Sequence, residues 1–200
     1  MSHKRIGVLG GTFDPIHAGH LAAAKAAIGC ARLDRVLFVP AGQPPHRPPA
    51  IAPAEQRREM CRLAIAGEAR FSVSDVELGR SGPSYTVDTL SDLLRLRPDT
   101  SLFLILGWDA ARLFPSWHRP EEIRTLASIV IIGRPGSGAP READLKPAGL
   151  EAEGVMLCLE PTPDISASEI RRAVAAGESI AGLVPEAVER YIAAHRLYAG

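Results

Sequence analysis

Short apolar runs alternate along the chain with longer segments of helical pattern, and this alternation is the feature that most constrains the fold. The predicted strands cover residues 5–10, 35–40, 71–76, 102–107, 128–133 and 155–159, and the predicted helices cover 20–29, 53–66, 86–96 and 120–126. Parallel strands need a long return path, which the helices provide. The sequence therefore predicts an α/β fold, a single doubly wound, Rossmann-like and mostly parallel sheet flanked by helices.

The length and charge of the chain narrow its class. With 200 residues the chain can bury a sizeable core, and we expect a single domain spanning residues 1–200. Lysine and arginine total 23, as do aspartate and glutamate, and the formal net charge is zero. No broad basic field marks a protein that binds nucleic acid or a membrane surface, so any anion site must be local.

The apolar runs and the cysteines of the sequence indicate the cellular compartment in which we expect the protein. No apolar run approaches the ~18 residues of a membrane helix. Two glycines interrupt the apolar stretch near the N-terminus after a few residues, so this stretch does not resemble a signal peptide. Cys30, Cys61 and Cys158 lie far apart, and their odd number argues against a disulfide framework and for a reducing compartment. We therefore expect a cytoplasmic protein.

A glycine-rich turn follows the first predicted strand and leads into an alanine-rich helix. Residues 10–13 precede Asp14 and Pro15, a pair that interrupts regular structure. Gly10 and Gly11 lack a Cβ, so the backbone can take positive φ there and an anion can approach the amides closely. Because ligands of parallel sheets lie at the carboxyl ends of the strands, and helix N-termini attract phosphate, the turn predicts a phosphate site.

Two histidines, His17 and His20, flank the predicted start of that helix. Lying three apart, they can both point at one anion, and each imidazole can donate an N–H to a phosphate oxygen. They are also plausible zinc ligands, although no C-x-x-C pair completes a site. The bland alternative is a pair of surface loop histidines. In the context of strand, glycines and helix start, the pair favours phosphate chemistry and no metal held by the protein.

A second helix start lies near the C-terminus. Ser166 or Ser168 is a suitable N-cap for a helix that runs to about residue 176, and Gly177 is a natural stop. A capped helix alone would explain the pattern. The functional alternative is a second helix N-terminus whose serine hydroxyls, amides and Arg171 guanidinium bind a polyphosphate. Two helix N-termini would then bind one triphosphate.

Taken together, these motifs resemble those of the nicotinate-nucleotide adenylyltransferases, members of the nucleotidyltransferase superfamily marked by a T/H-x-G-H motif. Here that motif is His17-Ala18-Gly19-His20. The resemblance continues through Phe38-Val39-Pro40, Pro44-Pro45-His46-Arg47, residues 84–90, Gly107-Trp108-Asp109 with Trp117, Arg134-Pro135-Gly136 and residues 165–171. The first and last motifs are shared across the superfamily, whereas the middle ones point to this branch.

The resemblance implies transfer of AMP from ATP to nicotinic acid mononucleotide, with Mg²⁺, to give deamido-NAD and pyrophosphate in NAD biosynthesis. Since the attacking phosphate is already an anion, in-line transfer without a covalent intermediate requires mostly positioning and charge neutralisation. By resemblance, His17 and His20 are the catalytic residues. The expected ATP and phosphate contacts come from both end motifs: Gly10, Gly11, Thr12, Phe13, Ser166, Ser168 and Arg171.

The middle motifs imply the remaining substrate contacts. Those to ribose and nucleotide fall on Gly107, Asp109 and Arg134, and those to the mononucleotide on Arg47, Ser84, Tyr85, Thr86 and Trp117. The Trp117 ring is expected to stack on nicotinate. A half-buried anchor is the alternative for Trp117, and a helix N-cap is the alternative for Asp109. Two departures from the family are Trp108, where a small residue is common and whose ring could reshape the pocket, and Arg47, where lysine is common.

Rival readings remain open at this point. A phosphopantetheine adenylyltransferase would share the end motifs but not Ser84-Tyr85-Thr86 with Trp117, and a cytidylyltransferase would carry an Arg-x-Thr-Glu-Gly element that is absent before residue 165. A nucleotide sensor or phosphate-binding scaffold would have no need for groups on the leaving phosphates. The expected partners are ATP and nicotinic acid mononucleotide, with no nucleic acid and no membrane. A homo-oligomer, and the preference for nicotinate over nicotinamide mononucleotide, are left open.

Overall fold

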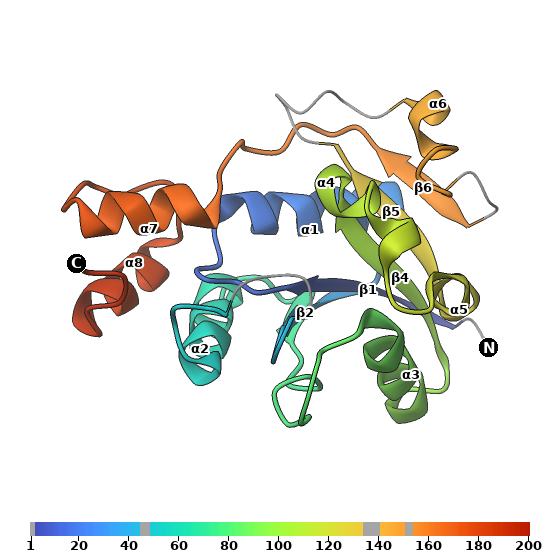
Figure 1. The fold of residues 1–200 in the computed structure, drawn as a ribbon, viewed down its shortest axis with the longest axis horizontal. Coiled ribbons are helices and arrows are strands. Elements are labelled where there is room, and N and C mark those ends of the chain that lie inside the picture. Colours follow the sequence, from blue (N-terminus) through green and yellow to red (C-terminus); the bar gives the residue numbers. More distant parts are fainter. Residues whose placement is uncertain (1–2, 45–48, 134–140, 151–153) are drawn as a thin grey trace.

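Six strands form one parallel sheet in a computed structural model of the chain, which describes residues 3–44, 49–133, 141–150 and 154–200 (Figure 1). Their bounds are β1 (Lys4–Gly11), β2 (Arg35–Pro40), β3 (Phe71–Val73), β4 (Thr100–Gly107), β5 (Ala127–Ile132) and β6 (Val155–Cys158). Their order is β3-β2-β1-β4-β5-β6, and every neighbouring pair is parallel. The chain winds outward from β1 in both directions, which confirms the doubly wound α/β fold.

Helices cover both faces of the sheet. They are α1 (Ala18–Cys30), α2 (Ala54–Ile65), α3 (Thr86–Leu96), α4 (Trp108–Ala111), the 3₁₀ helix η1 (Phe114–Ser116), α5 (Pro120–Leu126), α6 (Glu142–Leu145), α7 (Ala167–Ala175) and α8 (Glu186–Ala194). The buried side chains of α1, α2, α7 and α8 form one core with one face of the sheet, and those of α3, α4 and α5 form a second core with the other. Figure 1 shows α1 and α3 on opposite sides of the strands.

The strand β2 illustrates how the sequence builds two cores. Val36 and Phe38 join the core with α1, whereas Leu37 and Val39 join the core with α3, because successive side chains of a strand point to opposite faces. Central strands of a parallel sheet are buried on both faces and therefore read as unbroken apolar runs. This burial explains why the apolar runs located the strands so well.

The predicted elements agree with the structure, with small differences at their ends. The predicted strand 71–76 ends at Val73, because residues after Ser74 turn away and Leu78 donates a backbone hydrogen bond to Asp75. The short helices α4, η1 and α6 were not predicted, since elements of three or four residues carry no measurable periodicity.

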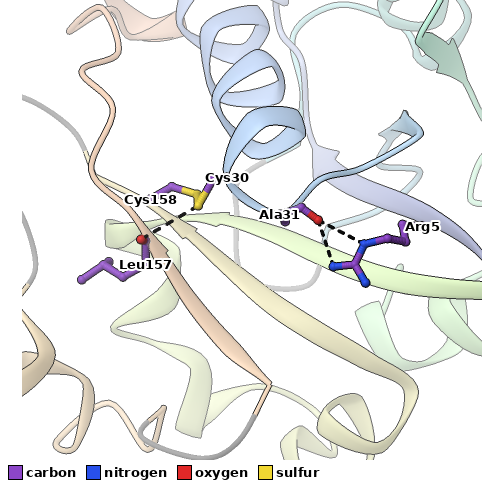
Figure 2. The surroundings of a disulfide bond; sticks show 5 residues. All are labelled: Arg5, Cys30, Ala31, Leu157 and Cys158. Carbon is purple, nitrogen blue, oxygen red and sulfur yellow. Dashed lines mark hydrogen bonds between the residues drawn. A yellow bond between two sulfur atoms is a disulfide. The ribbon is translucent and has the colours of Figure 1, made fainter.

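The cysteine argument is wrong for two of the three residues, because Cys30 and Cys158 form a disulfide (Figure 2). Cys30 is the last residue of α1 and Cys158 the last of β6, 128 positions apart. The topology returns the chain to the end of α1, a proximity that spacing along the sequence does not reveal. Cys61 is free and buried, and burial raises the pKa of its thiol. The cysteines therefore give no support to a reducing compartment.

The C-terminal helices lie at the start of α1 (Figure 1). The backbone N–H of Ala18 donates to the carbonyl of Leu183 at 2.9 Å, and a Cβ on Gly19 would come within 3.3 Å of the Pro163 carbonyl. This packing brings the start of α1 and the C-terminal segment together at the carboxyl end of β1. In the described ranges no helix has the length and apolar character needed to cross a membrane.

Candidate active site

The two histidines meet at the carboxyl end of β1. His17 is the N-cap of α1 and is 2% exposed, and His20 lies in the first turn of that helix. Their rings stack with centroids 3.7 Å apart, and the His17 backbone N–H donates to Nδ1 of His20 at 3.2 Å. Because Nδ1 of His20 accepts this bond, the neutral ring carries its proton on Nε2, which makes Nε2 a donor for an anion. The structure thus brings together the pair that the sequence singled out.

The glycine-rich turn differs in detail from its prediction. Neither Gly10 nor Gly11 has positive φ, since both end strand β1; the left-handed residue is Phe13, with φ of 50°. A non-glycine residue is uncommon there, and the buried ring of Phe13, packed on Phe38 and edge-on to His20, holds it. Within the described residues no heavy atom lies within 4 Å of the position that a Cβ would take on Gly10. Close approach of a ligand therefore fits Gly10 without positive φ.

The second helix start also lies against this turn. Ser166 is the N-cap of α7, as predicted; its hydroxyl accepts the Glu169 N–H at 3.2 Å and donates to the Glu169 carboxylate at 2.8 Å. The bond from the hydroxyl to the carboxylate, together with one from the Ser166 backbone N–H at 3.2 Å, lowers the pKa of Glu169. The hydroxyl of Ser168 is 3.1 Å from that of Ser166. Arg171, from the same helix, donates to the backbone carbonyl of Asp14 at 2.7 Å.

The end of β4 places the residues predicted to contact ribose. Gly107 is the N-cap of α4, so Asp109 is not the cap; its side chain is 56% exposed and pairs with Arg112 at 2.7 Å. Trp108 is 8% exposed, and its ring packs in the core with α3.

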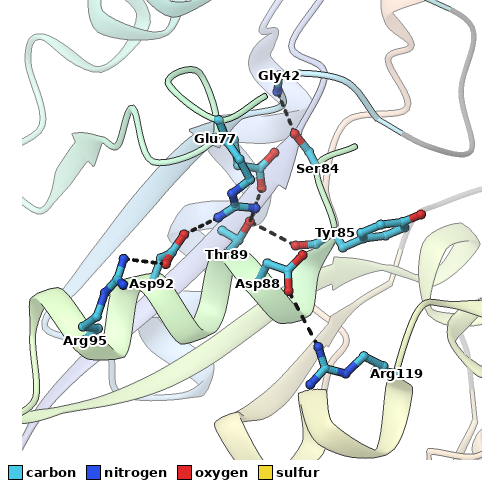
Figure 3. Close-up of polar contacts among 10 residues, drawn as sticks. Gly42, Glu77, Ser84, Tyr85, Asp88, Thr89, Asp92, Arg95 and Arg119 are labelled. Atoms are coloured by element: carbon cyan, nitrogen blue, oxygen red, sulfur yellow. Dashed lines mark hydrogen bonds and ion pairs between the residues drawn. The ribbon is translucent and has the colours of Figure 1, made fainter. Parts of the chain in front are cut away.

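The predicted mononucleotide residues 84–86 lie at the start of α3 (Figure 3). The Ser84 hydroxyl accepts the backbone N–H groups of Gly42 and Gln43, each at 3.2 Å. The Tyr85 ring packs on His118, with centroids 4.2 Å apart. Thr86 is the first residue of the helix, and it is half-buried.

Trp117 lies on the neighbouring segment between η1 and α5. Its half-buried ring packs on Phe114 with centroids 5.6 Å apart, at the edge of the core with α3. Arg119 follows at 3.8 Å from Asp88 of α3, a contact that joins the two segments (Figure 3). Trp117 thus combines a packed side with an accessible one. Two predicted contacts, Arg47 and Arg134, fall outside the described residues.

Sequence reasoning missed the buried polar residues that support the site. Asp14 is 5% exposed, Arg57 is 2% exposed, and Glu77 is also buried. Thr89 donates to Glu77 at 2.7 Å, and burial raises the pKa of this carboxyl. For Arg57 a signal existed, because it shares the apolar stripe of α2 with Met60. A charged residue on a buried face indicates a specific partner.

Comparison with known proteins places the chain in a family. Residues 8–173 match the cytidylyltransferase-like family model. A protein of Thermus thermophilus named "Probable nicotinate-nucleotide adenylyltransferase" is 48% identical over 97% of this chain and 99% of its own length. The chain belongs to the nicotinate-nucleotide adenylyltransferase family. A family member of the same name from Dehalococcoides mccartyi is 44% identical over 99% of this chain and 98% of its own length.

Solved structures agree on the fold of this family. The Plasmodium falciparum nicotinic acid mononucleotide adenylyltransferase complexed with NaAD superposes with a TM-score of 0.81 at 22% identity, and 98% of each chain is covered. The same protein complexed with APC gives a TM-score of 0.79, again over 98% of each chain. At this identity the likeness establishes the architecture, and the family assignment rests on the closer sequence relatives.

Proposed function

We propose that this chain transfers AMP from ATP to nicotinic acid mononucleotide and releases deamido-NAD and pyrophosphate, a step of NAD biosynthesis. A single nucleotidyltransferase domain of residues 1–200 carries the reaction. Support comes from the names of the relatives at 44% and 48% identity and from the six-stranded sheet with a phosphate-type turn at β1.

The stacked pair His17 and His20 is the observation that carries the proposal. The pair lies between the end of β1 and the start of α1, where the positive end of the helix dipole favours phosphate. In-line attack by the mononucleotide phosphate places extra negative charge on the α-phosphate oxygens. A donor such as Nε2 of His20 stabilises that charge, and no base or covalent intermediate is needed because the nucleophile is already ionised.

The remaining contacts extend this arrangement to both substrates. The backbone amides of the glycine-rich turn bind phosphate; this turn consists of Gly10, Gly11, Thr12 and Phe13. The outer phosphates are bound at the start of α7 by Ser166, Ser168 and Arg171. Arg171 would exchange its bond to the Asp14 carbonyl for one to phosphate, or make both, since a guanidinium has five N–H donors. On the acceptor side, Ser84, Tyr85, Thr86 and Trp117 bind the mononucleotide, and Gly107 and Asp109 contact ribose or nucleotide.

Mg²⁺ fits this reaction as a companion of ATP. Through the described ranges, no three histidine, cysteine, aspartate or glutamate side chains gather as a metal site. Mg²⁺ keeps several waters and binds readily through substrate phosphates, so phosphate oxygens and water would hold it here. When bound, it supplies charge neutralisation on the departing pyrophosphate, and the histidines supply directed N–H donors.

Pyrophosphate release from ATP and Mg²⁺ tests the proposal, with nicotinic acid mononucleotide, nicotinamide mononucleotide and phosphopantetheine offered in parallel. We expect release with nicotinic acid mononucleotide well above the other two. Release with phosphopantetheine alone would keep the nucleotidyltransferase superfamily and overturn this branch of it. ATP binding by isothermal titration without release for any acceptor would instead identify a nucleotide sensor.

A further inference from the structure

Asp14 gathers hydrogen bonds from two distant parts of the chain. Its Oδ2 accepts the backbone N–H of Ile51 at 2.7 Å, and its Oδ1 accepts the backbone N–H of Ala52 at 3.1 Å. Oδ1 also accepts the hydroxyl of Tyr198 at 2.7 Å, from the third-last residue of the chain. Hydrogen bonds to an ionised carboxylate are short and roughly twice as strong as neutral ones. This single side chain therefore ties residues 51–52 and the C-terminus to the histidine turn.

Arg57 makes the reciprocal connection from α2. Its Nε donates to the Ala52 carbonyl at 3.1 Å, and its terminal nitrogen donates to the Thr12 carbonyl at 2.6 Å. Burial lowers the pKa of Arg57, while the charge of Asp14 opposes that shift. Burial and the nearby Asp14 carboxylate raise the pKa of Tyr198, which keeps its hydroxyl a donor. Two buried side chains of opposite charge thus bind the same two segments to each other.

Two described stretches between β2 and α2 are held by residues next to the proposed substrates. Ser84 accepts the N–H groups of Gly42 and Gln43, and Asp14 accepts those of Ile51 and Ala52. The Asp14 backbone carbonyl in turn accepts Arg171 of α7. Asp14 therefore connects the histidine turn, residues 51–52 on the acceptor side and the helix proposed to bind the outer phosphates.

We propose that Asp14 is a positioning residue, anchored by Tyr198, that fixes residues 51–52 and Arg171 relative to the two histidines. The inference rests on the proposed function for its catalytic consequence. Asp14 does not have to touch substrate, because its carboxylate is already surrounded by protein donors. A lost hydrogen bond at this junction alters the alignment of the acceptor phosphate with the α-phosphate, to which in-line transfer is sensitive.

Tyr198→Phe tests the anchor, because it removes one hydroxyl and keeps the buried ring. We expect KM for nicotinic acid mononucleotide to rise about 5-fold, the size of one net hydrogen bond, with a smaller change in KM for ATP. Tyr191→Phe is the matched control: its half-buried ring stacks on His195 with centroids 4.0 Å apart, away from Asp14, so its kinetics should match those of the wild type. An unchanged KM for the mononucleotide in Tyr198→Phe overturns the proposal.

Asp14→Asn tests the junction by a measurement that needs no turnover. The amide nitrogen that replaces one carboxylate oxygen cannot accept from a backbone N–H, so hydrogen exchange at one of the two amides, Ile51 or Ala52, should speed up by about 10-fold or more. We expect kcat/KM to fall by a similar factor. Unchanged exchange at both amides contradicts the junction, and accelerated exchange with normal kinetics contradicts its positioning role.

The two proposals fail in different ways. If the wild type is silent with nicotinic acid mononucleotide but active with another acceptor, the proposed function fails, and the KM comparison of Tyr198→Phe is made with that acceptor. If the wild type is active as proposed and Tyr198→Phe behaves like Tyr191→Phe, the positioning role alone fails. If no acceptor supports turnover, unchanged amide exchange in Asp14→Asn overturns the junction, and accelerated exchange supports it.

Discussion

The phosphate side and the acceptor side of the candidate site are built differently. On the phosphate side, His17, Asp14 and Arg57 are nearly inaccessible, and the hydrogen bonds of Asp14 and Arg57 join segments far apart in the sequence. On the acceptor side, Tyr85 packs on the exposed ring of His118, and Asp109 pairs with Arg112 while both stay more than half exposed. Buried hydrogen bonds are costly to leave unmade, whereas exposed pairs contribute little. The fold therefore fixes the phosphate chemistry and leaves the acceptor side adaptable.

The largest effect on activity should come from the phosphate side. His20→Ala removes a donor that acts on charge developing in the transition state, so kcat should fall by about 10²–10³-fold, the cost of one such donor. Steady-state pyrophosphate release measures this change, and circular dichroism checks that the variant folds. A folded variant with near-normal kcat would remove His20 from the catalytic role.

Loss of a buried charge on that side should reduce stability. Arg57→Met leaves the Thr12 and Ala52 carbonyls without their charged donor, and we expect the free energy of unfolding to fall by about 2–3 kcal/mol. Urea denaturation measures it. The control is the neighbouring Arg58→Met, because Arg58 forms ion pairs with two exposed carboxylates, Glu55 and Asp75. Its free energy of unfolding should fall by about 0.5 kcal/mol. Equal losses in the two variants would contradict the contrast between buried and exposed contacts.

On the acceptor side, truncation should alter binding more than chemistry. Trp117→Ala removes the ring proposed to stack on nicotinate, and KM for the mononucleotide should rise about 10-fold, as expected for one lost stacking contact. Full kinetics in both substrates measure it, and a change confined to KM for ATP would contradict the assignment. Trp108→Phe is the control, because that ring lies in the core and its loss should lower stability without changing KM.

The smallest effect concerns Glu77, under the acceptor side (Figure 3). Burial raises its pKa in the folded state, while Thr89, Ser84, Arg80 and the Gly42 N–H, which all face this carboxyl, oppose the shift. A raised folded pKa means that the carboxyl contributes stability below its unfolded pKa and loses it as pH rises through the folded value. When the pH is raised from the unfolded pKa of about 4.3 towards neutrality, the wild type should therefore lose melting temperature relative to Glu77→Gln. A constant difference across that range would contradict the shift.

The sequence predicted most of the architecture because the central strands are buried on both faces and α7 begins at an ordinary capping signal, Ser166. It also singled out His17 and His20, because glycines, strand end and helix start frame them. Proximity created by the topology was not predictable: the Cys30 to Cys158 disulfide spans 128 positions, and Asp14 meets Tyr198 from the opposite end of the chain. The local sequence pattern also could not show which tryptophan is buried: Trp108 lies in the core, and Trp117 is half-buried at the edge of that core.

A double-mutant cycle on His20 and Trp117 tests the central comparison most directly. Both single variants leave the Asp14 junction in place, so one should lower kcat and the other raise KM for nicotinic acid mononucleotide independently. We expect the double variant to show both effects together, with a coupling in kcat/KM below about 0.5 kcal/mol. A coupling above about 1 kcal/mol would show that the two sides act as one unit, and would contradict a site divided into a fixed phosphate side and an adaptable acceptor side.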